Sequence, residues 1–223
     1  METRPRSSTR ATKDDSGSAG AILELLGLFA VVYAFQWITA VFGTMSGLFV
    51  LSPPLSDNPW TIVTSVYAHG GPGHLLSNSL ALIIFGWPVA RATTRLRFHT
   101  FFVVTGAIAG ISQILITNTV AATPLVAGSG TVGVLGASGA VFALLGYLIA
   151  SNRLSASLAS FVMVPQWVSL LVFLALATAV TLATAAPGVA LIAHFSGLFI
   201  GLLAGRARLL SVGQARATSR STV

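Results

Sequence analysis

The sequence contains no cysteine and few charged residues. Without cysteine, the chain can form neither a disulfide bond nor a thiolate metal site. Charged residues make up only 8% of its 223 positions, whereas soluble domains carry about 25%. Hydrophobic residues make up 54%, and the mean hydropathy is +0.86. These values exclude an ordinary soluble domain and predict a polytopic, all-α membrane protein.

Six apolar segments approach the length of about 20 residues that a helix needs to cross a bilayer. They are expected at about 21–43, 74–90, 98–116, 135–151, 166–185 and 189–205. Residues 44–73 contain too many helix breakers for a span and are expected to be irregular, lying partly in the interface. The predicted domains are a disordered basic tail over 1–20, a membrane domain over 21–205 and a basic tail over 206–223.

Basic residues outnumber acidic ones by 12 to 5, giving a formal net charge of +7. All 12 Lys and Arg residues lie in the two tails or in the connections 91–97 and 151–157, whereas the connections on the other side contain none. The positive-inside rule therefore places both termini in the cytoplasm. The same distribution explains the basic charge without nucleic-acid binding and suits contact with anionic lipid headgroups. Short termini without a transit-type peptide favour a prokaryotic plasma membrane.

Four polar residues are expected at similar depth, near the outer ends of three spans. They are His74 and Asn78 in the second span, Ser138 in the fourth and His194 in the sixth. Polar groups inside a membrane are energetically unfavourable and are therefore candidates for function. Each also has a simpler interpretation, because a lone serine often serves helix packing and a lone histidine or asparagine can bridge two helices.

Ser138 lies in the segment Gly136-Ala137-Ser138-Gly139, where a glycine-rich connection becomes an apolar helix. The N–H groups of the first helical turn are unpaired and form the positive end of the helix dipole. Negative charge that develops beside Ser138 would be stabilised there. This is the environment that a nucleophilic serine needs during acyl transfer.

Glycines predict which way His194 points. Gly197, Gly201 and Gly205 recur every four residues, and His194 shares their helix face. The fourth span has its own small residues near the face of Ser138, namely Gly139, Ala143 and Gly146. Packing the two small faces together would bring the Ser138 hydroxyl near the His194 imidazole.

His74 and Asn78 are four residues apart, so they share one helix face and could both donate hydrogen bonds to an oxyanion. Glu24 is expected at the cytoplasmic end of the first span and Asp57 in the outer loop, so no carboxylate lies at this depth. A Ser–His dyad therefore fits better than a triad. Aspartyl proteases need two carboxylates, and the sequence contains no His-Glu-x-x-His motif of a metalloprotease.

Zinc bound by His69, His74 and His194 is a further alternative. This set has no carboxylate base beside it, so we expect neither a metal nor another cofactor. A transporter or channel would spread polar residues through the depth of the spans or show an inverted repeat. The polar residues instead gather at one depth, and no repeat is evident, which favours an enzyme.

The sequence resembles the rhomboid family of intramembrane serine proteases over about residues 21–205. The shared motifs are Gly136-Ala137-Ser138-Gly139, the His-x4-His-x3-Asn pattern of His69, His74 and Asn78, and Ala193-His194-Phe195-Ser196-Gly197 with Gly201. The resemblance implies a six-helix rhomboid-like bundle. It also implies that Ser138 is the nucleophile and His194 the general base and acid. His74, Asn78 and the Ser138 backbone N–H would form the oxyanion hole.

The resemblance implies supporting roles for two further residues. His69 would lie at the outer mouth and help to hold water, and Gln113 would line the water path. Two positions depart from the family pattern. Phe142 replaces a tyrosine that packs against the catalytic histidine, and Trp60-Thr61 replaces a Trp-Arg pair of the first outer loop.

The expected function is hydrolysis of peptide bonds in or near the transmembrane segments of single-span or polytopic membrane proteins. Such substrates would enter from the bilayer and unwind locally, because a stable helix hides its carbonyl groups in its own hydrogen bonds. The alternative is a catalytically inactive protein of the same fold that binds transmembrane helices without cutting them.

Overall fold

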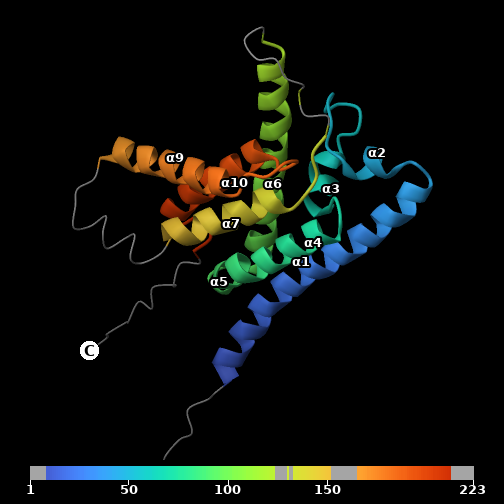
Figure 1. Ribbon diagram of the computed structural model, residues 1–223. Coiled ribbons are helices and arrows are strands. Elements are labelled where there is room, and N and C mark those ends of the chain that lie inside the picture. The colour runs from blue at the N-terminus through green and yellow to red at the C-terminus, as the bar shows by residue number, and fades with distance from the viewer. Residues whose placement is uncertain (1–8, 124–129, 131–132, 152–164, 212–223) are drawn as a thin grey trace, which may run out of the picture.

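The computed structural model describes residues 9–123, 130, 133–151 and 165–211 (Figure 1). Its helices are α1 (Thr9–Val41), α2 (Met45–Phe49), α3 (Thr61–Tyr67), α4 (Pro72–Ala81), the π-helix η1 (Leu82–Gly86), α5 (Trp87–Arg91), α6 (Arg95–Ala121), α7 (Ser138–Ser151), α9 (Gln166–Ala183) and α10 (Leu191–Arg206). Within these ranges there is no β-strand, and Leu51 and Val134 form one isolated antiparallel bridge.

Three helical stretches in the described part of the chain are long and apolar enough to cross a membrane. They are Ala19–Val41, Pro72–Arg91 and Arg95–Ala121, with 23, 20 and 27 residues. Three shorter apolar helices follow them, at Ser138–Ser151, Trp167–Ala183 and Leu191–Arg206. The predicted all-α character is therefore confirmed for the described residues, and the chain is a multi-pass integral membrane protein.

Two segments that were expected to be irregular contain helix. The tail predicted to be disordered over 1–20 is helical from Thr9 onward, as the first part of α1. Extending an established helix adds one hydrogen bond per residue without a new nucleus, so polar residues can continue a packed apolar helix. Residues 44–73 contain α2 and α3, and the indole of Trp60 anchors α3 by donating to the Gly47 carbonyl oxygen at 2.9 Å.

The second apolar segment is three consecutive pieces rather than the single helix that the sequence suggested. The π-helix η1 separates α4 from α5, and Pro88 follows one residue into α5. Proline cannot donate a backbone hydrogen bond, and its ring clashes with the carbonyl group four residues earlier. The wider turns of η1 relieve that clash, and such segments are frequent at functional sites.

The helices α7 and α10 pack with their backbones in direct contact, and α6 runs steeply beside both (Figure 1). A Cβ atom placed on Gly197 would contact the Gly139 carbonyl oxygen, and one on Gly201 would contact that of Ala143. A Cβ atom on Gly205 would lie 2.5 Å from the backbone carbonyl oxygen of Tyr147. The glycine face of α10 therefore lies directly on α7, as the four-residue spacing predicted.

At the end of the bundle where α6 begins, an ion-pair cluster joins α1 to α6. The Glu24 carboxylate lies 2.8 Å from Arg95 Nη1 through one oxygen and 2.8 Å from His99 Nε2 through the other. Both partners belong to the first turns of α6, next to the basic connection that follows α5. Glu24 thus connects α1 to α6. It lies away from the polar residues that were expected near the outer ends of the spans.

Candidate active site

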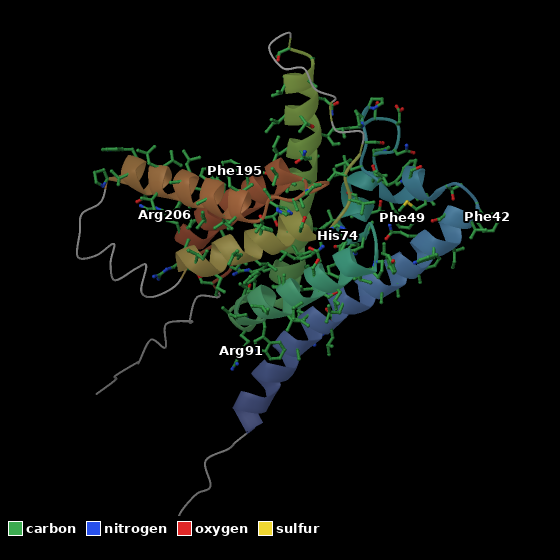
Figure 2. The ribbon with its side chains drawn as sticks, in the orientation of Figure 1. Phe42, Phe49, His74, Arg91, Phe195 and Arg206 are labelled. Atoms are coloured by element: carbon green, nitrogen blue, oxygen red, sulfur yellow. The ribbon has the colours of Figure 1, made fainter. Side chains whose placement is uncertain are left out.

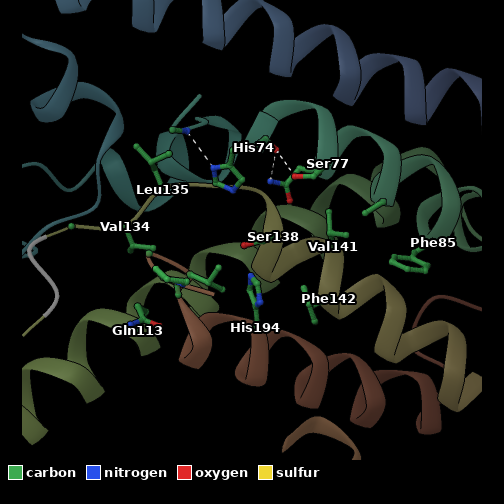
Figure 3. A pocket seen from close by; sticks show the side chains of 18 residues that line it. His74, Ser77, Phe85, Gln113, Val134, Leu135, Ser138, Val141, Phe142 and His194 are labelled. Carbon is green, nitrogen blue, oxygen red and sulfur yellow. Dashed lines mark hydrogen bonds between the residues drawn. The ribbon is translucent and has the colours of Figure 1, made fainter. Parts of the chain in front are cut away.

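A cavity of about 790 Å³ lies between α4, α7 and the beginning of α10. Figure 3 shows its lining side chains converging from these helices, with the Ser138 hydroxyl near the centre. The lining includes six of the residues singled out in the sequence: His74, Asn78, Gln113, Ser138, Phe142 and His194. The structure therefore brings together residues that are up to 120 positions apart in the chain.

Ser138 is the first residue of α7 and follows the turn at Ala137. The Val141 N–H donates to the Ala137 carbonyl oxygen at 3.0 Å, which is the first backbone hydrogen bond of this helix. The N–H groups of Ser138 and Gly139 precede that bond, so they belong to the set that a helix leaves without an internal partner. The hydroxyl group thus lies at the positive end of a helix, beside the cavity.

The His194 ring is held flat against Phe142. The two ring centroids are 4.1 Å apart with an interplanar angle of 18°, and His194 is 8% exposed. Figure 3 shows the imidazole extending from α10 toward Ser138. His194 Nδ1 is buried without a hydrogen-bond partner, and no hydrogen bond joins its ring to Ser138 in this arrangement. In serine hydrolases the corresponding bond is commonly long without substrate and shortens when substrate binds.

The backbone around His74 determines which of its ring nitrogens carries a proton. The Gly70 N–H donates to His74 Nδ1 at 3.2 Å, so Nδ1 is the acceptor and a neutral ring carries its proton on Nε2. A Cβ atom on Gly136 would lie 2.9 Å from that Nε2, and Gly136 has a φ of 134°. Only glycine readily meets both conditions. The Nε2–H donor thus lies beside the turn that leads into Ser138.

Asn78 lies one turn after His74 on α4 and is 4% exposed. Its Nδ2 atom donates to the His74 carbonyl oxygen at 3.0 Å, which orients the amide. A primary amide has two N–H donors. The second donor is therefore available to a group that enters the cavity next to Ser138.

His69 does not lie at the outer mouth of this cavity, contrary to the sequence-based expectation. It is 1% exposed, and its ring packs edge-on against Phe29 of α1, with centroids 4.8 Å apart, and against His74. Its backbone is fixed by Gln36, whose Oε1 accepts from the His69 N–H at 2.9 Å and whose Nε2 donates to the His69 carbonyl oxygen at 3.2 Å. These contacts turn the ring inward, toward α1.

We expect the buried His69 ring to make the protein sensitive to acid. His69 lies outside the membrane-spanning helices, and burial, together with the neighbouring His74, lowers its pKa from 6.5 to about 4. The unfolded chain then binds more protons than the folded one between these pH values. The free energy of unfolding should therefore fall as the pH drops from 6.5 to 4, by up to about 3 kcal/mol.

The matching variant is His69→Phe, which keeps an aromatic ring beside Phe29 and removes the titrating group. Unfolding in detergent between pH 7 and pH 4.5 should show a shallower loss of stability for the variant than for the wild type. Parallel pH profiles of the two proteins would contradict a neutral, buried His69.

Comparison with known proteins agrees with the motifs. The profile described as "Rhomboid domain" matches residues 56–211. RHOMBOID-like protein 4 of Arabidopsis thaliana is 30% identical over 164 residues, which cover 73% of this chain and 37% of the relative. The chain thus aligns with little more than a third of the length of that curated relative.

Proposed function

Because this chain belongs to the rhomboid family, we propose that it is an intramembrane serine endopeptidase that hydrolyses peptide bonds in or near the transmembrane segments of other membrane proteins. The observation that carries this proposal is the cavity in which Ser138, at the start of α7, faces His194 of α10. The family suggests the reaction class, and the cavity lining includes the serine and the histidine that such a reaction needs.

In the proposed reaction, His194 removes the proton from the Ser138 hydroxyl while Oγ forms a bond to the carbonyl carbon of the substrate. The carbonyl oxygen becomes an oxyanion, which the Ser138 N–H, His74 Nε2–H and an Asn78 amide hydrogen stabilise. The C–N bond then breaks as protonated His194 gives its proton to the leaving amine. Water, deprotonated by His194, next hydrolyses the acyl-enzyme and regenerates the Ser138 hydroxyl. No metal or cofactor takes part.

The proposed topology has six spans with both termini in the cytoplasm, and a membrane domain over 21–205 between two basic tails. The arrangement of charged side chains supports it. Figure 2 shows Arg91 and Arg206, at the ends of α5 and α10, on one side of the molecule, and Phe42 and Phe49 on the other. A prokaryotic plasma membrane remains a prediction, and the plant relative gives it no support.

The test is to identify the serine that reacts with a fluorophosphonate probe. Ser77 is a matched internal control, because it lines the same cavity and its hydroxyl donates to the His74 carbonyl oxygen at 3.1 Å. After incubation of the detergent-purified protein, mass spectrometry of its peptides should find the adduct on Ser138 and none on Ser77. A folded protein that forms no adduct on Ser138 would refute the protease proposal and favour a protein that binds membrane helices without cutting them.

A further inference from the structure

The helix α10, which carries the proposed base, has no capping side chain of its own. Its N-cap residue is Ala190, and alanine offers no oxygen atom to the free N–H groups of the first turn. The connection before α10 includes Gly188 at a φ of 79° and is exposed. A helix that starts in this way would fray at its first turn unless another segment supplied the missing acceptor.

Gln113 of α6 supplies that acceptor across 79 residues of sequence. Its Oε1 atom accepts from the Ile192 N–H at 3.0 Å and from the Ala193 N–H at 3.1 Å. Gln113 is 7% exposed, and its bond to Ala193 is buried. The remaining first-turn donor, the Leu191 N–H, bonds to the Val189 carbonyl oxygen at 3.0 Å.

His194 is the residue that immediately follows the capped pair. Its N–H donates to the Ala190 carbonyl oxygen at 3.1 Å, which is the first hydrogen bond formed within α10 itself. The cap therefore holds the backbone immediately before His194, while the glycine contacts with α7 hold the rest of the helix. Both contribute to the direction of the imidazole.

The same face of α6 also touches the start of α7. Ala109 lies one turn before Gln113, and a Cβ atom on Gly139 would lie 2.5 Å from the Ala109 Cβ atom. The beginning of α7 next to Ser138 and the beginning of α10 next to His194 therefore rest on neighbouring turns of one rigid helix. α6 therefore supports both ends, in addition to the direct contact between α7 and α10.

We propose that Gln113 is a positioning residue for the Ser138–His194 pair, acting as an interhelical N-cap of α10. This inference rests on the proposed protease function for its kinetic consequence only. The cap itself is a structural claim and can be tested whether or not the protein cuts a substrate.

Two substitutions of Gln113 distinguish the loss of the capping oxygen from a change in the shape of the side chain. Gln113→Leu has no acceptor and leaves the Ile192 and Ala193 N–H groups unpaired, whereas Gln113→Glu keeps a carboxyl oxygen at the same length. Gln36→Leu is the matched control, because it removes two buried hydrogen bonds at the His69 backbone, away from α10.

The first readout is hydrogen–deuterium exchange of the peptide that contains Ile192 and Ala193, measured on the whole protein in detergent. Gln113→Leu should raise exchange there about tenfold. Gln113→Glu and Gln36→Leu should leave it at the wild-type rate. Unchanged exchange in a folded Gln113→Leu protein, or equally fast exchange in Gln36→Leu, would overturn the cap.

The second readout is the rate at which a fluorophosphonate labels Ser138. Gln113→Leu should slow labelling by about 10- to 100-fold, because a small misplacement of a catalytic group has an effect of that size. Gln113→Glu should recover most of the rate. If the wild type is labelled and Gln113→Leu reacts equally fast, the positioning role is wrong although the protease proposal stands. If the wild type is never labelled, only the protease proposal fails, since exchange still tests the cap.

Discussion

Replacing His194 with alanine is expected to slow cleavage of a transmembrane substrate by about 10³-fold, and replacing Ser138 with alanine to abolish it. The His194 imidazole extends toward Ser138 in the cavity, and the carboxylate of Glu24 is committed to Arg95 and His99 at the other end of the bundle. The other imidazole of the lining, His74, accepts from the Gly70 N–H through Nδ1, so its remaining ring nitrogen is a donor and not a base. The measurement is the initial rate of reporter cleavage in liposomes.

His99→Ala is the control for the removal of a histidine. His99 lies outside the cavity and binds Glu24. Removing its side chain should weaken the contact between α1 and α6 and leave the cleavage rate within a few-fold of the wild type. The assignment of His194 is wrong if His194→Ala retains the wild-type rate in a folded protein. Cleavage that persists in Ser138→Ala would refute the assignment of the nucleophile.

Replacing Gly201 with alanine is expected to lower the free energy of unfolding by more than about 3 kcal/mol. A Cβ atom at Gly201 would overlap the Ala143 carbonyl oxygen and lie 2.8 Å from the Ala143 carbonyl carbon. Both atoms are backbone and cannot rotate away, so α7 and α10 must separate. Thermal or denaturant unfolding in detergent measures the loss, and catalysis should fall with it because the same interface aligns Ser138 with His194.

Gly27→Ala is the matched substitution, since Gly27 also lies inside a helix but a Cβ atom added there would meet no neighbouring group within 4 Å. Its effect on stability should not exceed about 1 kcal/mol in either direction. Equal effects of the two alanines would show that helix propensity, and not backbone contact, determines the cost at Gly201.

The meeting of Ser138 and His194 in one cavity was predictable because their neighbours repeat at helical spacing. Glycines every four residues fixed the face of His194, and a glycine-rich entry into an apolar helix marked Ser138. His69 was misplaced because spacing along α4 says nothing about a residue that precedes the helix. The direction of the His69 ring depends on Gln36, which lies 33 residues earlier in another helix.

The capping role of Gln113 could not be found from local sequence, because its bonds reach backbone N–H groups 79 and 80 residues away. Ala190 at the N-cap position was the available signal, since it shows a helix without a local cap. Pro88 was the signal in the sequence for the break of the second apolar segment. The extent of α1 had no such signal, because it depends on helix propagation that composition does not reveal.

The order of the helices along the chain has a consequence for biosynthesis. α6 and α7 emerge from the ribosome before α10, and they hold the cap and the packing surface that α10 requires. A nascent chain that has inserted only as far as α7 therefore carries its serine without its base. On the proposed function, such a chain is inert toward other proteins in the membrane, and docking of α10 is the event that creates a competent enzyme.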